Sequence, residues 1–340
     1  VLLGLKRRDE GWEWGAMRTK PQDDDHVGFS GWRLLGLGFW QAWWMISMCT
    51  DVLLPTTDRF PFAGNTTLWV LVLTTVGYLV VVALARRLSP FLTHRASFLA
   101  AGGLTAAGTV TLPIALTLGS GAAGFAWFLA GTVSLSLGNA LLLIMWGELW
   151  SALATGRVGR HLYVSYTFAF VLFFVAYALP EAAAVAFTAA LPIVSAAVLV
   201  ACKREPRREP SVLPLDVRTI PVGRIFACIL VISIVYGASQ GMVNTFAEGD
   251  AAFTAAGCAL AAITLSMVVA PSAAEPIALY RPVIPAMVAG LILLLLLPAP
   301  YRFLGAGLVI MGVYCLDMFM MLVSTDVAFR GRIPVALSFG

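Results

Sequence analysis

Long runs of apolar residues, separated by short polar segments, make up most of this 340-residue chain. A bilayer core about 30 Å thick needs a helix of about 20 apolar residues to cross it. Ten runs come near that length: residues 34–56, 66–85, 96–118, 122–146, 162–180, 182–201, 223–244, 251–270, 283–299 and 303–324. Because the runs are continuously apolar and do not alternate, they predict membrane-spanning helices and exclude the strands of a closed barrel.

The composition agrees with a membrane protein. The chain is 60% hydrophobic and 12% charged, whereas about a quarter of the residues in a soluble domain are charged. A chain with so little charge cannot cover its own surface with polar side chains in water. The sequence therefore predicts an all-α, polytopic bundle of membrane helices with the lipid bilayer as its first partner.

The Lys and Arg residues alternate between the segments that separate the runs. If the ten runs all cross the membrane, 20 of the 22 basic residues fall on one side. The positive-inside rule makes that side cytoplasmic. We therefore expect a multi-pass protein of the inner (plasma) membrane with a cytoplasmic N-terminus. The basic stretch "CKREPRREPSVLPLDVRT", which begins at Cys202, is then the longest cytoplasmic loop.

Six runs precede this loop and four follow it, which is a major-facilitator-like layout. The expected divisions are a cytoplasmic segment 1–33, a first six-helix half 34–201, the basic loop 202–222 and a second half 223–340. An eleventh apolar run starts at Ile333 and is cut off by the end of the chain, so we expect a truncated second half. Met17 is an alternative to Val1 as the natural start of the protein.

Polar and ionisable residues inside the runs are candidates for a binding site, because such groups are costly in hydrocarbon. Seven residues are predicted to bind a small-molecule ligand: Trp44, Asp51, Asn139, Tyr236, Gln240, Asn244 and Asp317. An aromatic or cationic ligand would suit two carboxylates and a Trp face. Each group also has a structural alternative: an interfacial aromatic belt, a buried protonated carboxyl, or hydrogen bonds between helices.

Catalytic and metal-binding patterns do not stand out in the sequence. The five Cys and three His are scattered and form no C-x-x-C or Cys/His cluster, so neither a metal nor a disulfide framework is expected. There is no Walker loop, Rossmann fingerprint or triad spacing. We therefore expect no enzyme activity and no cofactor.

Three stretches of sequence resemble a known family. They are the aromatic "GFWQAWW" from Gly38, "WGELWSALATGRVGRHLYVSYTFAF" from Trp146 and "LDMFMMLVSTDVAFRGR" from Leu316. Together they resemble the N-terminal membrane region of bacterial LuxR-type helix-turn-helix regulators, which carry a facilitator-like bundle. The loop "ALARRLSPFLTHRAS" supports this resemblance, because it lacks the Gly and Asp of the transporter signature G-x-x-x-D-R-x-G-R-R.

The resemblance implies a membrane-embedded module that senses a small molecule. DNA would bind only through a C-terminal domain that lies beyond Gly340. The alternative is a major-facilitator-type transporter of a small organic compound.

Overall fold

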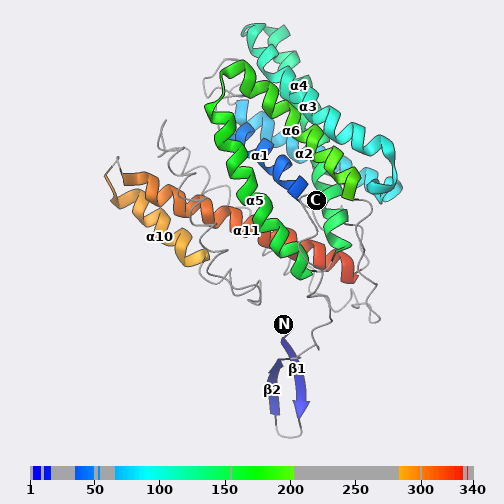
Figure 1. Ribbon diagram of the computed structural model, residues 1–340, viewed down its shortest axis with the longest axis vertical. Coiled ribbons are helices and arrows are strands. Elements are labelled where there is room, and N and C mark those ends of the chain that lie inside the picture. Colours follow the sequence, from blue (N-terminus) through cyan, green and yellow to red (C-terminus); the bar gives the residue numbers. More distant parts are fainter. Residues whose placement is uncertain are drawn as a thin grey trace.

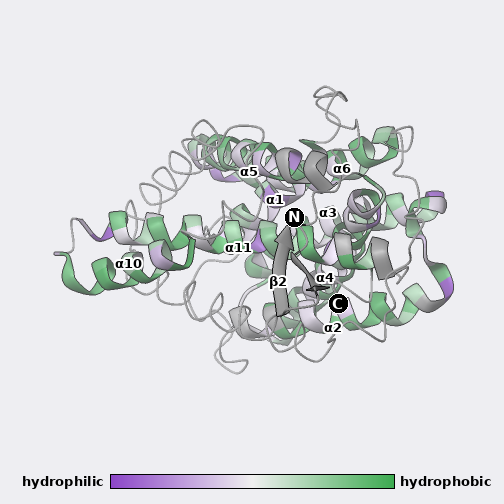
Figure 2. Cartoon of the chain, turned by 90° about the horizontal axis from the view of Figure 1, so that it is seen from below, coloured by the Kyte–Doolittle hydropathy of each residue, from purple (hydrophilic) through white to green (hydrophobic). Residues whose placement is uncertain are grey.

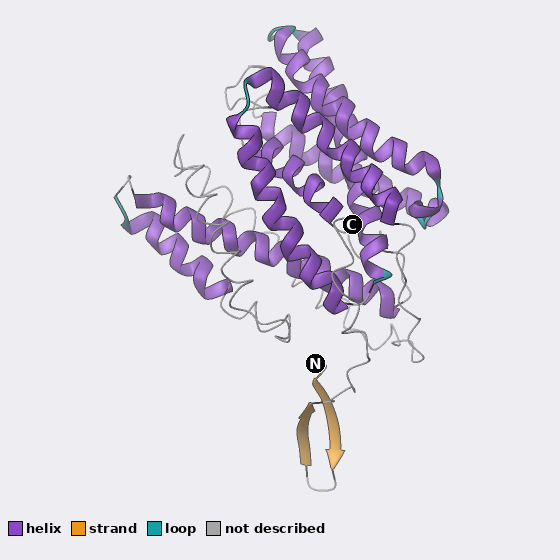
Figure 3. Cartoon of the chain, viewed as in Figure 1, coloured by secondary structure: helices purple, strands orange, loops and turns teal. Residues whose placement is uncertain are grey.

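A computed structural model of the chain describes residues 3–8, 11–16, 35–49, 53, 66–153, 155–202, 283–298, 301–331 and 335. Helices dominate these residues, as Figure 3 shows. The helices are α1 (Gly36–Cys49), α2 (Thr66–Leu88), α3 (Arg95–Thr117), α4 (Ala122–Ser151), α5 (Thr155–Ala178), α6 (Glu181–Ala201), α10 (Val283–Leu296) and α11 (Arg302–Gly331), with a 3₁₀ turn η3 (Phe91–Thr93) between α2 and α3.

Local sequence signals explain several of the helix ends. Helix α3 ends at Thr117, and Gly119 then adopts a φ of 86°, a left-handed conformation that glycine reaches without strain. Pro180 precedes the first residue of α6, where its missing N–H costs nothing. Helix α10 ends at Leu296, two residues before Pro298, which cannot continue a helix.

The predicted count of about ten spans, and with it the facilitator-like fold, is wrong. In the part of the chain that the structure describes, five helices are long and apolar enough to cross a membrane: α3, α4, the His161–Ala178 part of α5, α6 and the Arg302–Thr325 part of α11. Helix α10 has 14 residues, a length of about 21 Å at 1.5 Å per residue, which is short of the bilayer core. The apolar stretch Val72–Ala85 of α2 is also in this shorter class.

These helices expose apolar side chains, as the helices of a membrane protein do. On α2 the exposed residues recur at helical spacing along one face and are Val72, Val76, Leu79 and Val80. The opposite face of α2 buries Thr74, Val81 and Ala85. In Figure 2 the helices are correspondingly coloured mostly in the green shades of hydrophobic residues. An apolar outer face of this extent is unfavourable in water and favourable in lipid, so this is a helical membrane protein.

Helix α1 lies inside the group formed by the first six helices. It packs against α5, α6 and α4, while α3 packs against α4 and α6, and α2 packs against α4. Glycines allow some of these close approaches. A Cβ on Gly77 of α2 would lie 3.0 Å from the backbone carbonyl carbon of Ser136 on α4, so the two backbones nearly touch there.

Helices α10 and α11 form a pair that reaches toward the first group. The N-terminal part of α11 packs against α10, where Gly290 and Gly305 lie against each other. The C-terminal part of α11 packs against α4 and α5. In Figures 1 and 2 the α10 end of the pair projects away from α1–α6.

The segment 1–33 contains an antiparallel hairpin, β1 (Leu3–Arg8) and β2 (Gly11–Ala16), which pairs Leu3 with Ala16 and which the all-α prediction did not include. Residues 203–282 lie outside the described part, so the basic loop and the predicted spans 223–244 and 251–270 stay predictions.

Candidate functional site

Three tryptophans on α1 carry the aromatic part of the candidate site. Trp40 Nε1 donates a 2.7 Å hydrogen bond to Asn139 Oδ1 on α4, and Trp43 Nε1 donates a 2.9 Å bond to Thr109 Oγ1 on α3. The Trp40 and Trp44 rings stack with 6.5 Å between their centroids and 16° between their planes. Trp40 and Trp43 are buried, whereas Trp44 is half-buried. The indoles therefore join α1 to its neighbours and leave one ring face partly accessible.

Buried polar atoms without hydrogen-bond partners lie on the same helices. Within the described residues these atoms include Gln41 Oε1 and Ser47 Oγ on α1 and Asn139 Nδ2 on α4. Asn139 is fully buried. The Tyr78 hydroxyl of α2 lies beside the Asn139 carboxamide, but Nδ2 does not reach hydrogen-bond geometry with any acceptor described. A buried polar atom left unpaired destabilises the folded protein by about 1–3 kcal/mol. A molecule that supplied the missing hydrogen bonds would therefore bind favourably to these groups.

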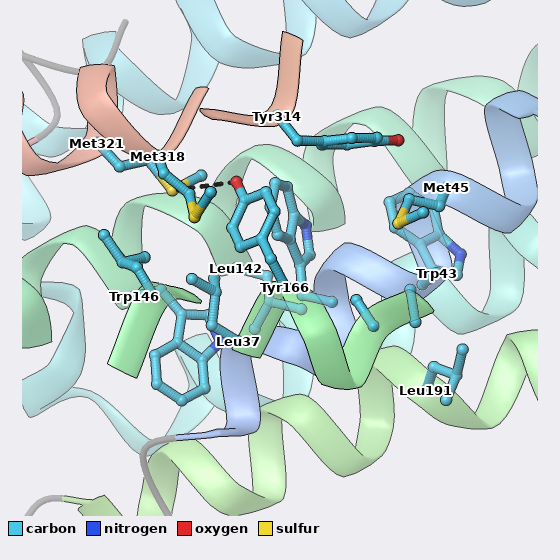
Figure 4. Close-up of a cluster of buried hydrophobic side chains, with 14 of the residues drawn as sticks. Leu37, Trp43, Met45, Leu142, Trp146, Tyr166, Leu191, Tyr314, Met318 and Met321 are labelled. Carbon is cyan, nitrogen blue, oxygen red and sulfur yellow. Dashed lines mark hydrogen bonds between the residues drawn. The ribbon is translucent and has the colours of Figure 1, made fainter. Parts of the chain in front are cut away.

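A carboxyl lies at the contact between the two helical groups. The Tyr166 hydroxyl on α5 donates a hydrogen bond to Asp317 Oδ2 on α11. The same hydroxyl lies 3.7 Å from the Met321 sulfur, an interaction drawn as a dashed line in Figure 4. The Tyr314 ring of α11 packs edge-on against the rings of Tyr166 and Phe170, at centroid distances of 5.9 and 5.4 Å.

Tyr78 connects these two sets of residues, because it lies within electrostatic range of Asp317 as well as beside Asn139. We therefore treat Trp40, Tyr78, Asn139, Tyr166 and Asp317 as one group and call it the interior polar cluster. It draws on α1, α2, α4, α5 and α11. The cluster offers an indole face, an amide donor, two phenols and a carboxyl, which can bind a small molecule but include no activated nucleophile.

Glu148 on α4 is another carboxyl within an apolar helix, and its hydrogen bonds differ from those of Asp317. Near the end of α4, its Oε1 accepts hydrogen bonds from the Phe91 N–H at 3.0 Å and the Ser89 hydroxyl at 3.3 Å. Its Oε2 accepts the Leu92 N–H at 3.0 Å. Glu148 thus caps the η3 turn and holds the α2–α3 connection against α4, which is a structural role.

The structure places three of the seven predicted ligand-binding residues. Asn139 and Asp317 belong to the interior polar cluster, and Trp44 stacks on Trp40 beside it. Asp51, Tyr236, Gln240 and Asn244 lie outside the described residues. Their participation in a site stays a prediction.

Sequence reasoning missed Tyr78 and Tyr166, which link the predicted residues to one another. Tyr78 stands in "VGYLV" and Tyr166 in "SYTFAF", both in the middle of apolar helices. A phenol buried at that depth normally finds a hydrogen-bond partner. That signal was available, but Asp317 lies 151 residues from Tyr166, and the sequence alone does not pair them.

No protein-family model matches the chain, and no curated protein matches it. The resemblance to the membrane region of LuxR-type regulators therefore stays a prediction. No group of three or more His, Cys, Asp or Glu residues that could hold a metal ion occurs in the described residues.

Proposed function

We propose that this protein is a membrane-embedded module that binds and senses a small organic molecule. The observation that carries the proposal is that three buried polar atoms on α1 and α4, namely Gln41 Oε1, Ser47 Oγ and Asn139 Nδ2, have no hydrogen-bond partner among the described residues. A structural role would favour full pairing of these atoms, since an unpaired group in a low-dielectric interior is destabilising. A bound ligand would supply the missing hydrogen bonds.

The sensing role rests on the resemblance to LuxR-type regulators. In this proposal the helical module lies in the inner (plasma) membrane with its N-terminus in the cytoplasm, as the positions of the basic residues favour. Ligand binding in the membrane would alter a DNA-binding domain that follows Gly340. The gene sequence downstream of the Gly340 codon tests this directly, because the proposal requires a helix-turn-helix domain there.

Transport of a small organic compound is the second candidate. The observation in its favour is Asp317, since intramembrane carboxyls occur along substrate and ion pathways. The two candidates differ in flux: a sensor binds its ligand without carrying it across the bilayer.

The experiment is a compound screen on the full chain in lipid nanodiscs. Thermal shifts with a library of neutral, cationic and anionic small molecules identify ligands, and each ligand is then tested for uptake into proteoliposomes. Binding without uptake supports the sensor, and binding with uptake supports the transporter. If no compound of any charge shifts the unfolding temperature, the proposed function is wrong.

A further inference from the structure

The exposed aromatic side chains lie near helix ends. Within the described residues there are four of them, Trp69, Trp127, Tyr177 and Tyr301. Trp69 is the fourth residue of α2, and Trp127 is the sixth residue of α4. Tyr177 is the last but one residue of α5, and Tyr301 immediately precedes α11. We call these four residues the aromatic girdle, and the arrangement of the helices decides whether they lie at one end of the bundle.

Trp69 and Trp127 lie at the same end. The Trp69 ring packs edge-on against Phe125, with 5.9 Å between the ring centroids, so α2 and α4 begin side by side. At the opposite end, Glu148 of α4 accepts hydrogen bonds from the connection between α2 and α3. Helices α2 and α4 are therefore parallel, and both exposed tryptophans are far from that connection.

Tyr177 lies at this end as well. Helix α6 runs antiparallel to α3, since Gly102, near the start of α3, lies against Ala196, near the end of α6. Residues 118–121 join the end of α3 to the start of α4, and residues 179–180 join the end of α5 to the start of α6. The end of α5, with Tyr177, is therefore at the end of the bundle where α4 starts.

Tyr301 lies toward the same end along α11. Asp317 of α11 bonds to Tyr166 of α5, whereas Tyr314, one turn earlier, packs against Phe170, one turn later. The two helices are thus antiparallel where they meet, and the start of α11 lies toward the end of α5. In Figure 1 the starts of α4, α6 and α11 accordingly lie at the top and left, away from the α2–α3 connection at the right.

The opposite end of the bundle exposes positive charge. Arg87, near the end of α2, and Arg95, the first residue of α3, are exposed on either side of the η3 turn. Arg302, at the start of α11, is instead half-buried and donates a 3.3 Å hydrogen bond to the Leu297 carbonyl oxygen. The described part of the bundle thus has an aromatic end and a basic end.

The two ends are about one bilayer apart. A Cβ on Gly131 of α4 would lie 3.1 Å from the Thr111 side chain of α3, and Trp127 is one turn before Gly131. Because α3 and α4 are antiparallel, Trp127 is level with about residue 115 of α3. From there to Arg95 is about 20 residues, or about 30 Å, which equals the thickness of the hydrocarbon core. The large apolar side chains exposed on α3 between these levels are all Leu, Val or Ile.

Trp and Tyr gather at membrane–water interfaces, because one side of each ring is apolar and the other bears a hydrogen-bonding group. Lys and Arg are attracted to the anionic surface of the cytoplasmic leaflet. We infer that the aromatic girdle lies in the phospholipid head-group region of the outer leaflet, while Arg87 and Arg95 contact the phosphates of the cytoplasmic leaflet. This inference concerns the lipid contacts of the protein and is independent of the small-molecule ligand proposed above.

Hydroxyl-radical labelling of the full chain in nanodiscs, followed by mass spectrometry, tests the girdle in the natural sequence. The radicals form in water, so side chains at the interface are oxidised, while those in hydrocarbon or in the protein interior are protected. We expect oxidation of the girdle residues and protection of Trp43 and Trp146, which are fully buried. Girdle residues as well protected as Trp43 and Trp146 would overturn the inference, whether or not any variant folds.

Spin labels at matched positions measure the depth. One pair is Trp127 and Val133 on α4, and the other is Tyr177 and Val171 on α5; all four side chains are exposed. Power saturation with oxygen and with a nickel chelate reports how deep each label lies. Six residues separate the members of a pair, so each valine position should be deeper than its aromatic partner by up to about 9 Å. Equal depths within either pair would overturn the inference.

The leaflet is tested by single cysteines in the two connections. A Cβ on Gly121, between α3 and α4, would meet nothing within 4 Å, and Thr93 is exposed in the η3 turn. In a background without other Cys, an impermeant thiol reagent added to intact cells should label Gly121→Cys and not Thr93→Cys. Labelling of Thr93→Cys alone would overturn the assignment of the girdle to the outer leaflet.

Discussion

The indole nitrogen of Trp40 donates a 2.7 Å hydrogen bond to Asn139 Oδ1, across 99 residues of sequence. This bond holds the first half of α1 against the middle of α4 and determines which way the Asn139 carboxamide points. Because Oδ1 is occupied by the indole, the amide nitrogen Nδ2, beside the Tyr78 hydroxyl, is the end that can bond another molecule. The Trp40–Asn139 hydrogen bond therefore both packs α1 against α4 and orients a group of the proposed binding site.

Removing the indole donor should destabilise the protein. Trp40→Phe leaves Asn139 Oδ1 unpaired in the interior and should lower the free energy of unfolding by about 1–3 kcal/mol. Trp127→Phe is the matched control, because the Trp127 side chain is 51% exposed on the same helix as Asn139. Unfolding in mixed detergent micelles, followed by circular dichroism, measures both. Equal stability of the two variants would mean that the Trp40–Asn139 bond contributes nothing.

Replacing either of two glycines on α3 with alanine should change the stability of the protein in different ways. A Cβ on Gly108 would lie 2.6 Å from the Gly131 carbonyl oxygen and from Leu135 on α4, whereas a Cβ on Gly103 would meet nothing within 4 Å. Gly108→Ala should therefore cost about 1–3 kcal/mol of stability through overpacking. Gly103→Ala should be neutral, or stabilising by up to about 1 kcal/mol through helix propensity. The same detergent unfolding measurement compares them, and a stable Gly108→Ala protein would contradict the close α3–α4 packing.

The Glu148 carboxylate should protect two backbone amides from exchange. In Glu148→Ala the Phe91 and Leu92 N–H groups lose their acceptor, so their hydrogen exchange should accelerate by at least about tenfold. Glu148→Gln keeps one acceptor oxygen and should show a smaller effect. The Leu118 amide, which bonds to Ile114 O at the end of α3, is the internal control. Unchanged exchange at Phe91 and Leu92 in Glu148→Ala would exclude the capping role.

Within the described residues, the positions of several helices were predictable from the sequence, because charged residues, Pro or Gly stand at or next to some of their ends. The predicted run 96–118 corresponds to α3 (Arg95–Thr117), and 182–201 corresponds to α6 (Glu181–Ala201). The number of spans was not predictable in this way. An apolar run such as 283–299 includes residues beyond the helix, and α10 itself stops at Leu296.

The candidate site was predictable only in part. Asn139 and Asp317 stand out because they are polar residues within apolar runs, and a single sequence is sufficient to notice them. Which residue each of them meets depends on how α4 and α11 pack, and periodicity within one helix carries no such information. Tyr78 and Tyr166 were missed for that reason, although they connect Asn139 to Asp317.

The Tyr166–Asp317 hydrogen bond should hold α11 against α5. Tyr166→Phe removes the donor and should broaden the distance distribution between spin labels at Val171 on α5 and Leu304 on α11, two exposed positions. Pulsed electron resonance on the full chain measures this distance. Tyr301→Phe, at a side chain that is 56% exposed, should leave the distribution unchanged. An unchanged distribution in Tyr166→Phe would show that other contacts alone hold the two helices together.

The orientation in the membrane can be tested within the basic loop. A single Cys at Ser211, in a background without other Cys, should react with a thiol reagent added to inverted vesicles and not with an impermeant reagent added to intact cells. The expectation follows from the five Lys and Arg residues of the stretch that begins at Cys202, because basic loops favour the cytoplasmic side. Labelling from outside the cell would reverse the orientation.

The central claim is that a small molecule binds among α1, α4 and α11, in contact with Asn139 and Asp317. The most direct test is a cryo-electron microscopy map of the full chain in nanodiscs, with a compound from the binding screen at saturating concentration. We predict ligand density within hydrogen-bond distance of Asn139 Nδ2 and against the Trp44 ring. Ligand density confined to the lipid-facing surface of α2 or α10, with the interior polar cluster unchanged from the ligand-free protein, would contradict the claim.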